Sequence, residues 1–433
     1  MCFFKKYSVG IPIILASLLV GFYIDVKCIN WTLAYGFFFS NEVGFMSLLY
    51  PSVVAGIFIL YFFTNIKGET NFFLTPFFLA AFLILFYSVT STFVGPPRVS
   101  VAFFSLFTIV GLVLPCFTIV NGKYLLISIM LWPCFAIFKL DQVFRMALSW
   151  QDVISMDASY AFMVPVIATI VYLFTYYRTD CKWPKMFITI LVFINSIFFL
   201  KLFLFGSRGP LLAIFLTIVF LFSTKYSKCK KGVIINKKRV IVTITIFLLI
   251  VLSIDIFFDM IFSIMEKIGI SSTALKKMVR LASEGNLSNG RNDLQILAFE
   301  GFWRNMLFGN GLDRFDANTG LDYPHNFVMQ ILYDGGLFLF CVLLIPIITK
   351  TLLNYKKCSY NQYVVQTFLF FSSVPYAFLS QDLWENAVFW LFVGSLFSST
   401  FVCSDKYYKM SAKDECMDKL TNDSLKYGTK KFC

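Results

Sequence analysis

The sequence predicts an all-α protein that crosses a membrane many times. Of its 433 residues, 58% are hydrophobic, 14% are charged and 55 are phenylalanine, which is more apolar surface than one soluble core can hide. Apolar stretches of about 20 residues, the length of a helix that spans a bilayer, recur along the chain. We therefore expect about 12 transmembrane helices in a single membrane domain over residues 1–403, with one large late loop at 259–324 and a polar tail at 404–433.

The apolar stretches also place the individual helices. The first follows Lys5 and Lys6 and resembles a signal peptide, but it lacks a small-residue cleavage site, so we expect a retained helix. A Gly- and Pro-containing turn at 206–210 joins two of the helices. The expected helices lie near residues 8–26, 46–64, 72–92, 101–120, 124–140, 159–177, 186–205, 209–224, 240–258, 326–348, 362–380 and 387–403.

The basic residues predict the orientation. Loops rich in Lys and Arg face the cytoplasm, and alternate loops, above all the cluster at 228–239, hold the larger share of these residues. Both termini are then cytoplasmic, and the loop at 259–324 lies outside. The net charge of +13 is carried largely by these short loops, so it does not indicate binding to nucleic acid.

The stretch at 286–340 is where the sequence places the chemistry. A polar loop passes there into an apolar helix, and the junction carries His325, the only histidine of the chain. Because imidazole titrates closest to physiological pH, His325 is the candidate general base; the alternative is a residue that only caps the helix. Pro324 marks the helix start, where unpaired N–H groups can hold an anion beside His325.

Arginines are the expected phosphate ligands, because the guanidinium fork matches phosphate oxygens. Those of the long loop are Arg280, Arg291, Arg304 and Arg314. Arg208 lies in the turn at 206–210, where flanking glycines let a ligand approach the backbone closely. The alternative for Arg208 is a side chain that extends to the membrane interface, and this is what we expect for Lys201.

No bound metal, cofactor or disulfide framework is expected. The eleven cysteines are scattered, without a C-x-x-C pair or metal-ligand spacing. No Asp-x-Asp pair stands out in a loop that would face water, as a catalytic divalent ion would need.

Part of the long loop has the residue spacing of a helix. Small and apolar residues recur there every three or four positions, so we expect an amphipathic helix that lies along the membrane. Its spaced residues are Leu294, Leu297, Ala298, Gly301, Phe302 and Met306.

Several short motifs together resemble a known family. The long loop reads Arg-Asn-Asp at 291–293, Phe-Gly-Asn-Gly at 308–311 and His-Asn at 325–326, with Gly336 eleven positions after the histidine. This order resembles the signature region of the O-antigen ligase and polymerase superfamily. Gly-Ser-Arg-Gly at 206–209 is similar to a second region of that family, an arginine in a short periplasmic loop.

The resemblance implies an enzyme of the bacterial inner membrane with a GT-C-like fold. It would catalyse inverting, metal-independent glycosyl transfer, with a glycan on undecaprenyl pyrophosphate as donor and a sugar hydroxyl of the next lipid-linked repeat as acceptor. His325 would be the catalytic base, and Arg208, Arg291, Arg314 and Asn326 would bind substrate. The chain's length and phenylalanine-rich helices are more similar to a Wzy-type O-antigen polymerase, whose partners would be membrane lipid and a chain-length regulator protein.

Two alternatives remain open at this point. One is the O-antigen ligase, which performs the same chemistry with lipid A-core as acceptor. The other is a polysaccharide flippase or another transporter, a class that commonly shows two related halves and charged residues deep in its spans. The chain shows no evident repeat and few charges within its apolar stretches, which favours the enzyme.

Overall fold

The computed structural model describes residues 10–28, 74–95, 97–99, 104–118, 120–139, 156–177, 182–227, 232–252, 267 and 290–398. The expected helix at 46–64 and the tail at 404–433 lie outside these residues. Every other expected helix overlaps a helix of the structure. The first half contains α2 (Gly10–Cys28), α5 (Leu74–Phe93), the π-helical turn η2 (Phe104–Ile109), α7 (Val110–Phe117), α8 (Gly122–Lys139), α10 (Met156–Thr175), α11 (Lys182–Phe205), α12 (Arg208–Ser223) and α13 (Lys237–Leu252).

The second half begins with two helices of the long loop and ends in the membrane domain. Its elements are α16 (Arg291–Arg304), α17 (Phe315–Thr319), α18 (Phe327–Leu339), the π-helical turn η3 (Phe340–Leu344), α19 (Ile345–Lys356), α20 (Tyr360–Leu379) and α21 (Ala387–Phe397). Among the described residues, three helical stretches have the length and composition of a membrane span, at Pro76–Phe93, Lys185–Phe203 and Phe327–Lys356. Shorter apolar helices accompany them, as in a polytopic membrane protein, and the expected number of about 12 spans stays a prediction.

The expectation of a purely α-helical chain is wrong in one place. Strands β1 (Thr224–Ser227) and β2 (Gly232–Ile235) pair antiparallel between α12 and α13. The run Val-Ile-Ile at 233–235 explains the strand, because β-branched residues favour extended backbone. Gly232 lies so close to the end of α19 that a Cβ there would be 2.2 Å from the carbonyl oxygen of Lys356.

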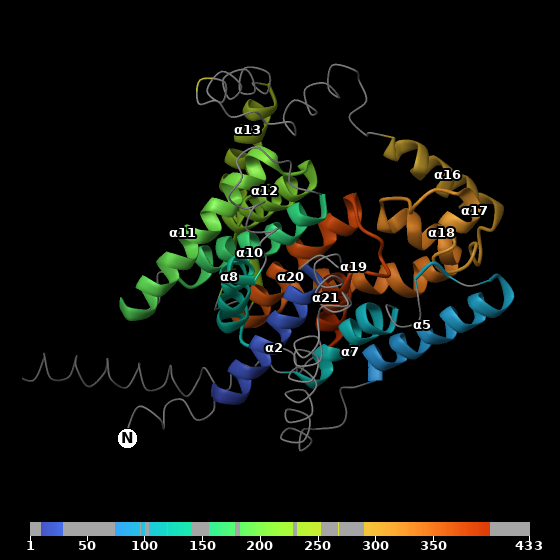
Figure 1. Ribbon diagram of the computed structural model, residues 1–433, viewed down its shortest axis with the longest axis horizontal. Helices are drawn as coiled ribbons and strands as arrows, with labels where there is room; N and C mark the ends of the chain where they lie inside the picture. The colour runs from blue at the N-terminus through green and yellow to red at the C-terminus, as the bar shows by residue number, and fades with distance from the viewer. Residues whose placement is uncertain are drawn as a thin grey trace, which may run out of the picture.

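The core is built around α10, which packs against α8, α11, α12 and α20 (Figure 1). Its residues from Ser159 to Ala168 are buried without exception. By contrast, α5 and α11 present large exposed apolar side chains such as Phe78 and Phe193. Exposed apolar surface of this extent indicates a surface that faces lipid.

Lys201 contradicts the expectation of a side chain that reaches to the membrane interface. It is 1% exposed and buried inside the protein. The reason is its place on α11: it follows Phe198 by three residues and neighbours Leu202, both buried, whereas Phe199 and Leu200 face outward. Helical periodicity therefore puts Lys201 on the inward face, which its distance from the helix end does not reveal.

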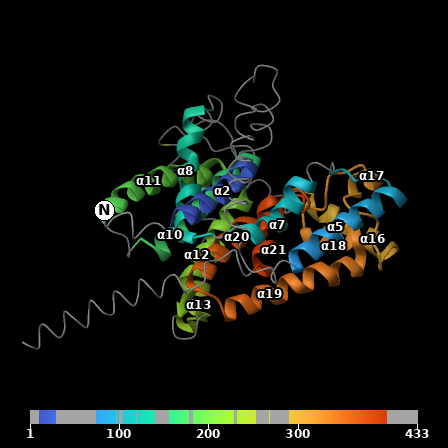
Figure 2. The same ribbon diagram turned by 90° about the horizontal axis from the view of Figure 1, so that it is seen from below.

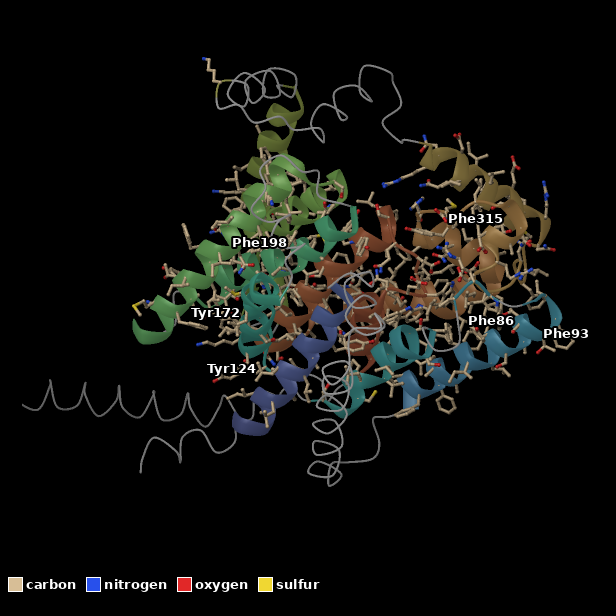
Figure 3. The ribbon with its side chains drawn as sticks, viewed as in Figure 1. Phe86, Phe93, Tyr124, Tyr172, Phe198 and Phe315 are labelled. Carbon is tan, nitrogen blue, oxygen red and sulfur yellow. The ribbon has the colours of Figure 1, made fainter. Side chains whose placement is uncertain are left out.

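The described part of the long loop, residues 290–324, lies at one end of the molecule, where α16, α17 and α18 are grouped at the same end as α5 in both views (Figures 1 and 2). The amphipathic helix expected there is present as α16, with Ala298 and Phe302 buried. Phe315, labelled in Figure 3, packs with Ala298 and Tyr333 in a small core between α16, α17 and α18. Leu297 and Met306, two other residues with this spacing, are exposed.

The expected helix at 326–348 is interrupted in its middle. Gly336 has φ of 61° and ψ of −156°, a conformation that only glycine adopts readily. The freed backbone is satisfied by the long loop: the amides of Leu337 and Phe338 donate to the carbonyls of Met306 and Leu307 at 2.9 and 3.1 Å. The helix is thus broken where the loop joins it, and it continues through η3 and α19.

The Phe-Gly-Asn-Gly motif completes the same junction. The amides of Asn310 and Gly311 donate to the carbonyls of Tyr333 and Asp334 at 2.8 and 3.0 Å. Gly309 has a φ of 71°, and a Cβ there would lie 2.4 Å from the carbonyl carbon of Asp334. The motif therefore holds the loop against α18, so part of the family-like signature is scaffold.

Gly309→Ala is expected to destabilise the protein by about 2–5 kcal/mol, because left-handed strain adds to steric overlap. Gly320→Ala is the matched control: its φ is 70°, but a Cβ there meets nothing within 4 Å, so only about 1–2 kcal/mol is expected. Thermal unfolding of the purified protein in detergent measures both. Equal melting temperatures for the two variants would contradict the contact with α18.

Candidate functional site

His325 lies directly before α18 in a left-handed conformation, with a φ of 53°. A non-glycine residue held in this region is strained. The helix cap is the next residue, Asn326, whose Oδ1 accepts from the amides of Val328 and Met329 at 3.0 and 3.3 Å. The capping role considered for His325 therefore belongs to Asn326, which fixes the point from which the histidine projects.

The imidazole of His325 is half-buried against Tyr323. The two ring centroids are 4.3 Å apart, and Nδ1 is enclosed, with no hydrogen-bond partner among the described residues. Burial lowers the pKa of His325 below its ordinary value of 6.5, and the positive charge of Arg291 lowers it further. The carboxylate of Asp322 acts in the opposite direction. The ring is consequently neutral at pH 7.

Arg291 begins α16, directly after Gly290 with its φ of 80°. Its Nη2 donates to Oγ of Ser380 at 3.0 Å. Ser380 is the residue that caps the C-terminal end of α20, so the contact joins the long loop to the last part of the membrane domain. The hydroxyl of Tyr323 donates to the carbonyl oxygen of the same Ser380, which brings His325 to this point as well.

Arg208 reaches the same region through its backbone. It is the first residue of α12, and its side chain lies outside what the structure describes. Its neighbour Gly209 packs so closely on Tyr160 that a Cβ would lie 1.8 Å from the phenol oxygen. The Tyr160 hydroxyl in turn donates to Oγ of Ser380 at 3.0 Å. The backbone turn of Arg208, together with Arg291 and His325, therefore converges on Ser380.

Arg314 lies at another edge of the long loop. Its guanidinium covers Gly95, where a Cβ would be 3.1 Å from Nη1, and Gly95 itself has a φ of 118°. The arginine thus joins the loop to the end of α5. Its expected role in substrate binding stays a prediction.

Arg98 closes the outer side of the cluster. Its guanidinium lies 5.8 Å from the ring centroid of Tyr323, and Nη1 is 3.8 Å from Oδ1 of Asp322. The Arg98 amide donates to the carbonyl of Asp313 at 3.1 Å. Arg98 therefore joins the segment that carries Tyr323 and His325 to the residues that follow α5.

Two buried carboxyl groups, those of Asp313 and Asp382, support the site. Oδ2 of Asp313 accepts from the Val99 amide at 2.6 Å, and Oδ1 of Asp382 accepts from the Trp384 amide at 2.8 Å. Burial, together with the neighbouring charge of Asp382, raises the pKa of Asp313 to about 11, so this carboxyl group is protonated at neutral pH. Protonation of Asp313 avoids a buried negative charge next to Asp382.

Sequence reasoning did not identify Ser380 or Tyr160. Neither residue type marks chemistry, and the available signal was only position, because both lie at the outer ends of expected helices, 362–380 and 159–177. Among the described residues, no group of three or more His, Cys, Asp or Glu side chains could hold a metal ion.

The comparison with known families matches the part of the chain that carries His325 and the predicted arginines. Residues 191–344 match the family model Wzy_C, described as O-antigen ligase. The matched range contains the turn of Arg208, Arg291, His325 and the kink at Gly336. No curated protein matches the sequence. Residues 191–344 are therefore similar to the O-antigen ligase family.

Proposed function

We propose that the protein is an O-antigen polymerase, which joins repeat units carried on undecaprenyl pyrophosphate by inverting, metal-independent glycosyl transfer. The observation that carries the proposal is the convergence of His325, Arg291 and the backbone turn of Arg208 on Ser380. One neutral base thus lies near two candidate phosphate ligands, as a transfer from a lipid pyrophosphate requires.

The proposed reaction assigns a task to each group. A hydroxyl of the acceptor sugar attacks the anomeric carbon of the donor, and the bond from that carbon to the pyrophosphate oxygen breaks. The oxygen departs with the electron pair, and Arg291 and Arg208 stabilise its charge. The hydroxyl proton passes to His325, and we assign this transfer to Nε2 because Nδ1 is enclosed. The lowered pKa keeps this base unprotonated.

The remaining predicted ligands have subsidiary parts in the proposal. Asn326 holds the start of α18 by accepting two backbone amides, and it would orient His325 or the sugar. Arg314 would contact the glycan from the edge of the loop near Gly95. A fully active Arg314→Ala variant would assign this arginine to holding the loop against α5.

The second candidate is the O-antigen ligase, which the matched family model names in its description. Its donor and chemistry are the same, and only the acceptor differs, because the ligase transfers the glycan to lipid A-core. The site described above serves either acceptor.

The lipopolysaccharide of a strain that lacks the protein separates these candidates. A core that carries a single repeat unit is the expected result for a polymerase. A core without any repeat would overturn the proposal in favour of a ligase or a flippase. Transfer between synthetic lipid-linked repeats by the purified full-length protein then separates an enzyme from a transporter.

The proposal places the site at the periplasmic face of the membrane and both termini in the cytoplasm. The reason is that most Lys and Arg lie in the alternate loops that would then be cytoplasmic. Alkaline phosphatase fused near Asn289 should be active, and a fusion near Lys231 should be inactive. The reverse pattern would contradict this orientation.

A further inference from the structure

We propose that Ser380 and Tyr160 form a positioning pair, which fixes the Arg291 guanidinium in the orientation that receives the pyrophosphate of the lipid-linked donor. The inference rests on the proposed function, because it assumes that Arg291 binds this group. It adds two residues outside the 191–344 range of the family match, one on α10 and one at the end of α20.

Ser380 joins three segments of the chain at one residue. Its hydroxyl accepts from the Tyr160 hydroxyl and from Nη2 of Arg291, each at 3.0 Å. Its carbonyl accepts from the hydroxyl of Tyr323, whose ring packs on His325. A hydroxyl oxygen has two acceptor sites, so the two donors occupy both and fix the direction from which Arg291 approaches.

Tyr160 is a rigid support for this arrangement. It is 2% exposed, and its ring stacks on Tyr376 with centroids 3.7 Å apart and an interplanar angle of 14°. Gly209 contacts its phenol oxygen on another side. The phenol therefore has one fixed position. Through Tyr160 and Ser380, the turn that carries Arg208 is connected to the Arg291 side chain.

The loop that follows Ser380 is held equally firmly. Nε2 of Gln330 donates to Oδ1 of Asp382 at 3.0 Å, and Oε1 of Gln330 accepts from the Leu383 amide at 2.9 Å. Nε1 of Trp384 donates to Oδ2 of Asp334 at 2.6 Å. Three buried side-chain contacts within four residues of Ser380 make it part of a fixed scaffold and not of a mobile loop.

This scaffold matters for Arg291 because a long side chain has many rotamers. Arginine loses conformational freedom when it binds a ligand, and a side chain that is already oriented loses less. Ser380 and Tyr160 touch Arg291, directly or through one hydroxyl, and need not touch the substrate. They are therefore positioning residues, and their removal is expected to weaken donor binding more than it slows the chemical step.

The test uses the full-length protein in lipid nanodiscs, with undecaprenyl pyrophosphate as the binding probe and lipid-linked repeats as substrates. Ser380→Ala is expected to weaken binding of the probe and raise the donor KM by roughly 10- to 100-fold, the range for a hydrogen bond to a charged group, with a smaller change in kcat. Tyr160→Phe removes a hydrogen bond between two neutral hydroxyls, so its effect in the same direction is expected to be smaller, roughly 2- to 10-fold. Ser380→Thr keeps the hydroxyl and is expected to retain most of the affinity.

Two matched controls test for a general effect of losing a buried hydroxyl. Ser373 is buried in α20 and donates to the Leu369 carbonyl of its own helix at 2.6 Å, so Ser373→Ala should bind the probe normally. Tyr172 is fully buried on α10, three turns from Tyr160, and Tyr172→Phe should also bind normally.

A double variant tests whether Ser380 affects probe binding through Arg291. Ser380→Ala is expected to cause no further loss of probe binding when Arg291→Ala is already present, because both remove the same contact. Independent, additive losses would overturn the inference in favour of a general structural role. Normal binding in Ser380→Ala and Tyr160→Phe, with Arg291→Ala impaired, would overturn it and leave the proposed function intact.

Failure of the proposed function gives a different result. A wild-type protein that transfers no glycan between lipid-linked repeats would refute the polymerase, whatever the binding data show. The probe titration still decides the inference in that case: selective loss of binding in Ser380→Ala and Tyr160→Phe supports it, and unchanged binding overturns it.

Discussion

His325→Ala is expected to lower the turnover of the purified enzyme by about 10²- to 10⁴-fold, the usual contribution of a general base. The variant should fold normally, because the α18 cap is Asn326 and His325 contributes no hydrogen bond to it. Donor binding should survive, since the proposal assigns it to the arginines. Single-turnover rates on lipid-linked repeats, beside the melting temperature and the affinity for undecaprenyl pyrophosphate, measure the three properties separately.

The pH dependence gives a second test of the same residue. Only the neutral imidazole accepts a proton, so the rate should fall as the pH drops through the pKa of His325, below 6.5. Asp322→Asn removes a negative charge that raises this pKa, and the acid limb should therefore move to still lower pH. Asp316→Asn, in the same loop, is the control and should leave the midpoint unchanged.

A His325→Ala enzyme with near-normal turnover would reduce His325 to a positioning residue. The base would then be sought among the carboxylates of the long loop, Asp293, Glu300, Asp316 and Asp322. An acid limb that is unaffected by Asp322→Asn would separately contradict the electrostatic link between this carboxylate and the imidazole.

Arg291→Ala and Arg208→Ala are expected to abolish polymerisation at normal protein levels. In the proposed reaction each arginine neutralises the leaving pyrophosphate, and lysine should rescue poorly because it lacks the planar fork. Arg304→Ala is the matched control: Arg304 ends the helix that Arg291 begins and is exposed, so its loss should be mild. The lipopolysaccharide ladder of complemented strains and the membrane level of each variant measure the outcome.

Full activity in both alanine variants would reject the assignment of the phosphate to these arginines. Loss of activity in Arg291→Ala alone would limit phosphate binding to Arg291, the side chain that contacts Ser380. Equal loss in Arg304→Ala would indicate that any change in the charge of α16 impairs the protein, and it would contradict a specific role for Arg291.

Local sequence patterns predicted a polytopic membrane protein and most of its helices, because a stretch of about 20 apolar residues is most often a helix that crosses the membrane. The sequence also singled out His325 by its uniqueness, and Arg291 and Arg208 by their motifs, as candidate site residues whose roles stay predictions. Local patterns were sufficient for these predictions, because the length of an apolar stretch and the types of its residues can be read from that stretch alone. The β1–β2 hairpin was missed because its few β-branched residues lie in a segment expected to be only a basic loop.

Contacts between residues far apart in the sequence became known only from the fold. Ser380 and Tyr160 are ordinary polar residues, and their part in the site follows from contacts across 220 positions of the chain. The break at Gly336 likewise depends on amides that the long loop satisfies, and the burial of Lys201 depends on what packs against α11. Such pairings are set by the packing of separate helices, a cooperative property that no single stretch of residues encodes.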